Sequence, residues 1–304
     1  MKIVAGIGGI EEYIPMVEAG ADEVFCGFVP FEWNNRYGNI IPLNRREVLY
    51  YNIQISSYVD MKILKKMVEK YKVPVSIAFN SLYYLEEQYP LITNIIGRLI
   101  DIGFNRFIIA DIGLILYLKK NNINCFIELS GECSELNNLS MDFFNQFDIS
   151  RYIFHRKNTI QDMKSCINEN SKKLEYEAFI LNERCHFTGA YCNSLHCDEL
   201  EHICKLPYIV TGFDNEDKLK QREKKLEEGY ILGKTGCGLC NLMELKEAGV
   251  THLKVVGRGN FLEAMIRDVE GLKYALTILE NSNNKEEYIK KVIKGKCSRE
   301  CYYS

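Results

Sequence analysis

One local pattern recurs along this chain of 304 residues: an amphipathic segment ends in glycine, and a run of apolar residues follows immediately. Glycine suits the left-handed residue just past the last turn of a helix, so Gly20, Gly103 and Gly249 predict helix ends directly before strands. A chain built from such units has a helix between consecutive strands, which favours a parallel sheet. The three copies are VEAGADEVFCG (17–27), IDIGFNRFIIAD (100–111) and KEAGVTHLKVVG (246–257).

Strand–helix alternation continues through most of the chain. About eight short apolar runs are typical of strands, and amphipathic segments separate them. A (β/α)8 barrel needs eight strands, so the predicted fold is α/β, a TIM-like barrel, with a doubly wound open sheet as the alternative. The strand candidates lie in KIVAGI (2–7), ADEVFCGF (21–28), VPVSIAFN (73–80), FNRFIIAD (104–111), INCFIELS (123–130), RYIFHR (151–156), LEYEAFI (174–180) and VTHLKVVGRG (250–259).

The regular pattern breaks between about 185 and 236, near the C-terminal strands. This stretch is rich in cysteine and contains DNEDKLKQREKKLEEG (214–229), which is typical of a solvated surface. We expect the cysteine-rich region, 183–240, to be an insertion within a barrel that spans residues 1–282. Residues 283–304 are then expected to form a C-terminal helix and tail.

Composition excludes several classes of protein. The apolar run after Lys2 is short and is interrupted by Glu11 and Glu12, so it does not read as a signal peptide. No stretch approaches the length of a membrane span. The net charge is −3 and the pI about 6.1, so nucleic-acid binding is not indicated, although a local basic patch would escape this average. We therefore expect a cytoplasmic protein.

Twelve cysteines are unusual for such a compartment, where clustered thiols more often bind metal or carry out redox chemistry than form disulfides. The spacing is Cys185-x6-Cys192-x4-Cys197-x6-Cys204, and Cys237-Gly-Leu-Cys240 follows. Structural zinc sites usually present short Cys-x2–4-Cys pairs, whereas the thiolates of an iron–sulfur cluster can come from separate loops. Spacing alone leaves three alternatives: an iron–sulfur cluster, zinc, or a scatter of unliganded or redox thiols.

The other cysteines have simpler interpretations. Cys26, Cys125 and Cys133 lie in or beside apolar runs and Cys166 lies on a predicted helix, so we expect all four in the core. Cys297 and Cys301 lie close to the C-terminal end of the sequence. We interpret this pair as bystanders, with metal binding as the alternative.

The chain resembles peptidase family U32. Glu177-Ala-Phe179, followed after five residues by Cys185-x6-Cys192, is similar to the family signature, although Asn182-Glu183 stands where the family has a glycine and a small residue. AGADEV (19–24) resembles an early family motif, and AGVTHLKVVGR (248–258) resembles a late one. These motifs occur in the expected order over most of residues 1–275.

The resemblance implies a TIM-like barrel and a [4Fe–4S] cluster held by four cysteines. Cys185, Cys192 and Cys237 match family positions, and Cys204 is preferred over Cys197 as the third ligand. Cys240 competes with Cys237, because both flank the expected start of a helix, where backbone amides favour a thiolate. Zinc remains the alternative metal.

Family members of this kind act in oxygen-independent hydroxylation, and others are described as collagenases. We therefore expect an enzyme that modifies an unidentified small or macromolecular substrate, with an electron-donor protein as a partner. A U32-type peptidase and a zinc-stabilised binding protein without activity are the alternatives. No HExxH or Gly-x-Ser-x-Gly motif supports proteolysis.

Active sites of (β/α)8 barrels lie just past the carboxyl ends of the strands. Glu132, His155, Arg156 and Arg258 occupy such positions and are the predicted catalytic residues. His155 and Arg156 would suit an anionic substrate, and Arg258 between two glycines could approach a carboxylate or phosphate. Asn80, Asp111 and Ser130 also follow strands, and Asp111 could instead cap the next helix.

Overall fold

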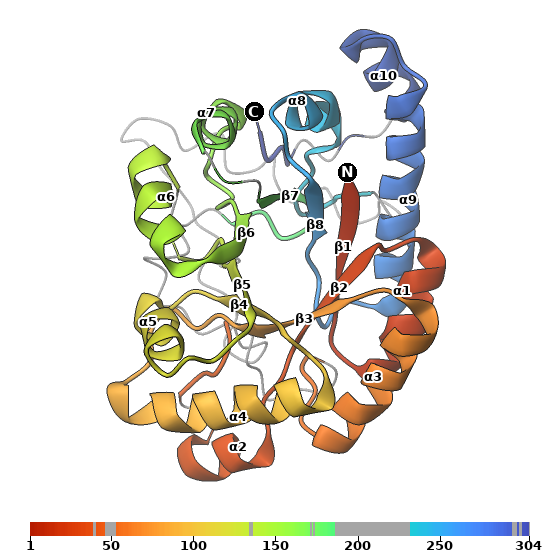
Figure 1. Cartoon of the computed structure of the whole chain (residues 1–304). Coiled ribbons are helices and arrows are strands. Elements are labelled where there is room, and N and C mark those ends of the chain that lie inside the picture. Colours follow the sequence, from red (N-terminus) through yellow and green to blue (C-terminus); the bar gives the residue numbers. More distant parts are fainter. Residues whose placement is uncertain are drawn as a thin grey trace, which may run out of the picture.

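The computed structural model describes residues 1–38, 41–45, 53–133, 136–170, 172, 174–185, 232–293, 297 and 300–303. Eight parallel strands pair in sequence order, and β1 pairs with β8, so the sheet closes into a barrel. The helices surround this barrel (Figure 1). The predicted TIM-like fold is therefore confirmed, and closure excludes the open sheet.

The strands are β1 (Lys2–Ile7), β2 (Glu23–Gly27), β3 (Val75–Phe79), β4 (Arg106–Ile109), β5 (Phe126–Leu129), β6 (Ile149–Ile153), β7 (Glu175–Leu181) and β8 (His252–Val255). The α-helices are α1 (Tyr13–Ala19), α2 (Phe31–Tyr37), α3 (Tyr58–Tyr71), α4 (Tyr89–Ile102), α5 (Ile112–Lys120), α6 (Asn138–Phe144), α7 (Ile160–Glu169), α8 (Leu242–Glu247), α9 (Leu262–Glu280) and α10 (Lys285–Val292). Short 3-10 turns are η1 (Ile10–Glu12), η2 (Glu86–Gln88), η3 (Asn145–Phe147) and η7 (Leu239–Asn241).

The recurring glycines end helices as their positions predicted. Gly20 follows α1 with φ of 109° and Gly103 follows α4 with φ of 110°, a conformation that disfavours a side chain. In each case a strand begins within three residues. The repeated sequence unit is therefore the αβ corner of the barrel.

Two layers of side chains fill the barrel. An apolar layer comes from alternating strand positions and includes Phe25, Ile153 and Phe179. Two residues earlier on the same strands, and hence on the same face, lie the buried polar residues Glu23, Arg151 and Glu177. The layer nearer the amino ends of the strands is therefore charged, and the one nearer the carboxyl ends is apolar.

The C-terminal segment returns to the barrel. Tyr288 on α10 is fully buried and donates a hydrogen bond of 2.8 Å to the Leu239 carbonyl. Further on, Tyr302 joins the apolar layer inside the barrel and Tyr303 donates to the Phe179 carbonyl at 2.5 Å. The end of the chain thus packs against the carboxyl ends of the strands. Among the described helices, none is long and apolar enough to cross a membrane.

Candidate functional site

A cavity of about 450 Å³ opens at the carboxyl ends of the strands. Its floor is the apolar layer of the barrel. Its wall carries polar and charged side chains from the loops that follow the strands, from Lys254 on β8 and from Glu300 in the C-terminal tail. Ligand sites of this fold lie at this end of the barrel. The wall includes Arg45, Asn80, Ser130, Glu132, Arg156, Glu183, Arg184, Cys185, Lys234, Thr235, Lys254, Arg258, Asn260 and Glu300.

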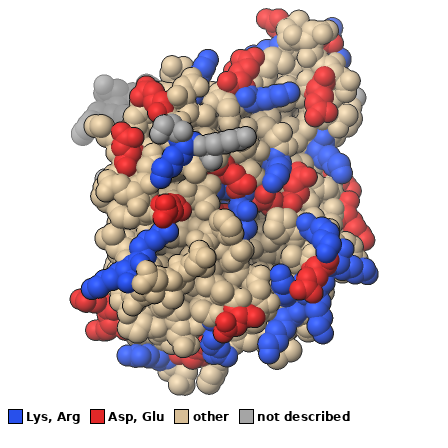
Figure 2. Space-filling view, viewed as in Figure 1, with Lys and Arg blue, Asp and Glu red and all other residues tan. Residues whose placement is uncertain are grey.

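Positive charge dominates the described wall. Six of its side chains are Lys or Arg and three are Glu, although the chain as a whole carries a net charge of −3. Over the face of the molecule in Figure 2, by contrast, basic and acidic side chains are interspersed. Basic groups that converge in a concave site favour an anionic ligand.

Glu132 joins two of the basic groups. Its carboxylate accepts a 2.9 Å hydrogen bond from Arg156 Nη1 and lies 3.6 Å from Arg45 Nε. The Arg156 guanidinium also stacks over the Phe179 ring, 3.9 Å from its centroid. Burial lowers the pKa of Arg156, but the charge and hydrogen bond of Glu132, together with Tyr302 and Cys185, outweigh this effect and the net pKa is raised. Arg156 is therefore a fixed cation in the wall.

Arg258 is a buried residue of the cavity wall, with 5% of its surface exposed. Its Nη1 donates a 3.3 Å hydrogen bond to Asn44 Oδ1. A Cβ on Gly27 would overlap Nη1, so glycine at the end of β2 leaves the space that this guanidinium occupies. Gly259 has φ of 81°, which lets the chain turn sharply after Arg258.

Lys254 connects the cavity to the charged layer below it. Its Nζ donates a 2.6 Å hydrogen bond to Glu177 Oε1 and lies 3.8 Å from the centroid of the Phe25 ring. Burial raises the pKa of Glu177, but Lys254 and then Arg151 outweigh it, so the net pKa is lowered. This part of the barrel is therefore ionised and paired.

Of the predicted catalytic residues, His155 is the one that the structure places outside the cavity wall. His155 is fully buried and does not line the cavity. Its Nδ1 accepts a 3.0 Å hydrogen bond from the Lys157 amide, so the ring caps its own turn. Of the four predicted catalytic residues, Glu132, Arg156 and Arg258 line the cavity. Asp111 caps α5 by accepting from the Gly113 amide at 2.8 Å, the structural role anticipated for it.

The predicted metal-binding cysteines fall in three places. Cys185 lies in the cavity wall and is near enough to Arg156 to affect its pKa. Cys192, Cys197 and Cys204 lie outside the described residues. Cys237 and Cys240 lie at η7, beside the C-terminal tail rather than in the wall. The described part of the chain thus contributes one predicted ligand, Cys185, to the cavity.

The four cysteines expected in the core behave as small apolar residues. Cys26 and Cys166 are buried, while Cys125 and Cys133 are half-buried against the main core. Burial raises the pKa of Cys26 to about 12 and that of Cys125 to about 11, so these thiols stay protonated near neutral pH.

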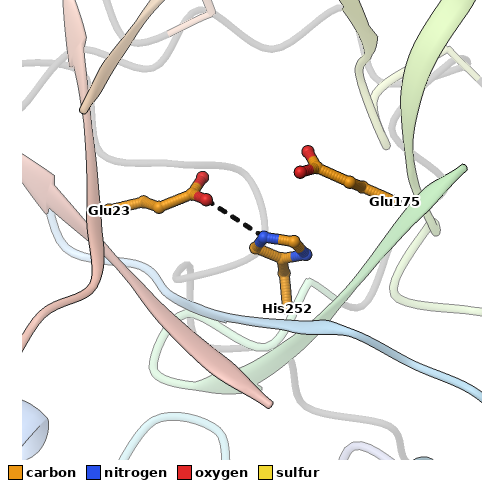
Figure 3. Close-up of side chains that lie close together, drawn as sticks. All are labelled: Glu23, Glu175 and His252. Carbon is orange, nitrogen blue, oxygen red and sulfur yellow. Dashed lines mark hydrogen bonds and ion pairs between the residues drawn. The ribbon is translucent and has the colours of Figure 1, made fainter. Parts of the chain in front are cut away.

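A second group of side chains has the composition of a metal site. Glu23, Glu175 and His252, from β2, β7 and β8, offer ligand atoms within 4.8 Å of one another, and their side chains converge in Figure 3. Arg151 Nη2 lies 2.5 Å from Glu23 and 2.7 Å from Glu175. The guanidinium already supplies the positive charge that a metal ion would bring, so we interpret this group as a buried ion-pair layer.

The departure from the family signature falls on an unusual turn. Asn182 and Glu183 have φ of 68° and 48°, a left-handed conformation that glycine adopts most easily. Asn tolerates it better than most residues. Two hydrogen bonds also hold the Asn182 side chain in place: its Nδ2 donates to Asp268 Oδ2 at 2.7 Å and to the Val256 carbonyl at 3.2 Å. The chain therefore keeps a turn that suits glycine without having glycine there.

The fold and the position of the cavity define a barrel protein of the class whose ligand sites lie at the carboxyl ends of the strands. Within that class, residues 8–303 match peptidase family U32, and the chain belongs to this family. The structure is similar to the U32 peptidase Mk0906, with 9% sequence identity and a TM-score of 0.46 over 63% of this chain and 73% of that one. It is also similar to the YdjI aldolase from Escherichia coli K12, with 10% identity and a TM-score of 0.42 over 96% and 86% of the two chains. No curated protein sequence matches the chain.

Several wall residues were missed by reasoning from the sequence. Arg45 lies in the segment between α2 and α3, where no strand end marks it. In the sequence, Lys254 was noted only as part of a family motif. It lies two residues after His252 on β8, so both side chains are on the same face of the strand, which is the face inside the barrel. Glu300 comes from the C-terminal tail, and the sequence contains no signal that brings it to the cavity.

Proposed function

We propose that this U32-family protein is an iron–sulfur enzyme that modifies an anionic substrate without molecular oxygen, by a reaction of the hydroxylation type. The observation that carries the proposal is the basic cavity at the carboxyl ends of the strands, with the Cys185 thiol in its wall. Arg156 beside Cys185 suits a thiolate ligand, because a nearby cation favours the ionised form of a thiol.

A [4Fe–4S] cluster bound here would supply one-electron transfer. Its ligands would be Cys185, Cys192 and Cys204, with the fourth thiolate expected from Cys237 or Cys240. Hydroxylation of a C–H bond with an oxygen atom from water releases two protons and two electrons. The electrons must pass to an acceptor, so the partner in this proposal is a protein that takes electrons from the cluster, whereas the sequence analysis expected an electron donor.

The residues of the cavity have separate roles in this proposal. Arg156 and Arg258 bind the anionic group of the substrate, because both are enclosed guanidinium groups that can bind carboxylate or phosphate in a bidentate manner. Glu132 holds Arg156 in place and is the carboxylate nearest to it that could accept a proton. Phe25 and Phe179 provide apolar surface at the base of the cavity.

Proteolysis is a weaker candidate on the same geometry. A cysteine or serine nucleophile needs a base within hydrogen-bond reach. Cys185 and Ser130 line the cavity, but no histidine does so among the residues that the structure describes.

The test is to purify the protein anaerobically and measure iron, acid-labile sulfide and absorption near 400 nm. We expect about four iron and four sulfide per chain in the wild type. Cys185→Ser should lose most of both, whereas Cys125→Ser should retain them, because Cys125 is a half-buried thiol directly before β5 and does not line the cavity. A wild type without iron or sulfide would refute the cluster. Equal iron in both variants would refute the role of Cys185.

Substrate charge is tested separately. Anionic probes such as malonate and inorganic phosphate should raise the melting temperature of the wild type. Arg258→Gln should weaken that effect, because it removes one enclosed positive charge from the wall. Stabilisation by cationic rather than anionic probes would contradict the proposal.

A further inference from the structure

Two cysteine pairs lie together outside the cavity, although about sixty residues separate them in the sequence. Cys237 precedes η7 and Cys240 lies within it, and Cys297 and Cys301 belong to the C-terminal tail. No disulfide involves any of the four. The sequence suggested that the tail cysteines were bystanders, and the structure brings them instead to the first pair.

Backbone pairing fixes one contact between the pairs. The Cys237 amide donates to the Glu300 carbonyl at 2.8 Å, and the Tyr302 amide donates to the Cys237 carbonyl at 2.9 Å. These bonds make a parallel bridge between Cys237 and Cys301. Residues paired in this way are about 4.8 Å apart and project their side chains on the same face.

The other two thiols lie close to this bridge. The Asn241 amide donates to the Gly238 carbonyl at 3.0 Å, which turns the chain so that Cys240 comes back toward Cys237. Burial raises the pKa of Cys237 to about 11, and the charges of Cys240, Cys297 and Cys301 each add to this rise. Cys297 and Cys301 affect Cys240 in the same direction. The bridge and the turn therefore place Cys237, Cys240 and Cys301 beside one another, and Cys297 lies four residues before Cys301 in the same tail.

We propose that Cys237, Cys240, Cys297 and Cys301 form a structural zinc site that fastens the C-terminal tail to the barrel. The spacings Cys-x2-Cys and Cys-x3-Cys are the two short pairs from which closed zinc sites are usually built. Four thiolates also leave no open coordination position, as a structural site requires. This inference goes beyond the proposed function and changes one part of it, because Cys237 and Cys240 are then no longer available as the fourth ligand of the cluster.

Zinc binding would draw the four sulfur atoms closer together. At a Zn–S distance of about 2.3 Å, tetrahedral ligands lie about 3.8 Å from one another. Among the described residues, no three thiols lie within 4.8 Å of one another. Metal binding therefore requires the thiols to move together, and Cys297 is exposed, so its side chain has room to turn inward.

The site would have a consequence for the cavity. Glu300, next to Cys301, lines the cavity, and Tyr302 fills the upper barrel and donates a hydrogen bond to the Asn182 carbonyl. Zinc at Cys301 therefore holds in place a tail that completes the cavity wall.

The proposal also separates the cysteines into two groups. If Cys237 and Cys240 bind zinc, four cysteines remain within twenty positions of one another for the cluster, namely Cys185, Cys192, Cys197 and Cys204. Cys197 then takes the fourth position that the sequence analysis gave to Cys237 or Cys240.

The test uses full-length protein and measures zinc, iron and sulfide in the same samples. We expect about one zinc per chain in the wild type and less than about a tenth of that in the double variant Cys297→Ser/Cys301→Ser, because two of four ligands are lost. Iron and sulfide should not change. Cys125→Ser is the matched control, and its zinc should equal that of the wild type.

Each other result overturns the inference. Zinc that persists in the double variant shows that the tail cysteines are not ligands. Iron that falls while zinc stays shows that they belong to an iron–sulfur site. Cys185→Ser should have the opposite effect of the double variant and remove iron but not zinc. Failure of the cluster proposal can therefore be distinguished from failure of the zinc proposal.

A measurement on the wild type covers the case in which the double variant does not fold. The native protein is alkylated before and after zinc removal by a chelator, and the labelled peptides are identified by mass spectrometry. Labelling of Cys237, Cys240, Cys297 and Cys301 should rise at least about tenfold when zinc is removed. Labelling that is unaffected by the chelator would overturn the proposal.

Discussion

Replacing Arg151 by methionine tests the charged layer inside the barrel. Arg151 is completely buried on β6. Its guanidinium lies 2.5 Å from Glu23, 2.9 Å from Glu177 and 2.7 Å from Glu175. Methionine fills a similar volume without the charge, so the variant leaves these carboxylates without their shared partner.

The magnitude follows from burial. Removing one partner of a buried ion pair costs about 3–5 kcal/mol, because the remaining charge has neither water nor a counter-ion. Arg106 and Lys254 still neutralise part of the negative charge of these carboxylates. We therefore expect the variant to lose about 3–5 kcal/mol of unfolding free energy in total, and not that amount for each ion pair that Arg151 makes. Arg98→Met is the surface control. Arg98 pairs with Glu32 but its side chain is 49% exposed, so its loss should cost at most about 1 kcal/mol.

The cost should depend on pH. Burial raises the pKa of Glu23, but the hydrogen bond from His252 and the charge of Arg151 outweigh it, and the net pKa is lowered. The wild type therefore gains stability from this carboxylate above its unfolded pKa and loses it in acid. Without Arg151 the carboxylates titrate at higher pH and can be neutralised by protonation. The difference between variant and wild type should thus shrink as the pH falls from 8 to 5.

Urea unfolding at several pH values measures this difference. Trp33 is the only tryptophan in the sequence and is fully buried, so its fluorescence reports unfolding, and circular dichroism gives a second signal. Arg151→Met/Glu177→Gln should recover part of the loss, because it removes one of the orphaned charges. A loss below about 1 kcal/mol at pH 8, or an equal loss at pH 5 and pH 8, would refute the reasoning.

Three further predictions concern the cavity and its surroundings. Gly27→Ala should weaken phosphate or malonate binding by about tenfold, because the new methyl group displaces the Arg258 guanidinium. Calorimetry measures the affinity, and unchanged binding would contradict this prediction. Burial raises the pKa of Glu12 to about 7, so the folded state holds this proton more tightly than the unfolded state and the free energy of unfolding should fall as the pH rises from 5 to 8. Glu12→Gln should abolish about 2 kcal/mol of that fall, measured by urea unfolding. Parallel pH profiles for the variant and the wild type would contradict this prediction. Tyr302→Phe should cost about 1–3 kcal/mol in the same assay because the Asn182 carbonyl loses its buried donor, and a neutral substitution would show that water replaces the hydroxyl.

Much of the fold could be predicted because its signals are local. Gly20 and Gly103 end helices through a backbone conformation that glycine favours wherever it occurs. The apolar runs and the helical periods between them are likewise properties of neighbouring residues. Closure is different, since it depends on hydrogen bonds between β1 and β8, which lie at opposite ends of the sequence.

The candidate site was predictable in part for the same reason. In a parallel barrel all strands end on one side, so Glu132, Arg156 and Arg258 could be expected near one another from strand positions alone. His155 shows the limit of this reasoning. The sequence places it at the end of a strand, but its ring accepts a hydrogen bond from the Lys157 amide in the following turn, and it does not line the cavity.

The sequence by itself determined that the chain is an α/β protein with repeated strand–helix units, a basic set of residues at strand ends and an unusual number of cysteines. Only the tertiary structure decided which of these residues meet. Cys301 reaches Cys237 through a backbone bridge, and Arg45 and Glu300 reach the cavity from loops without any periodic pattern. Periodicity is set by near neighbours along the chain, whereas the cavity wall and the cysteine group depend on contacts between segments that only the closed barrel brings together.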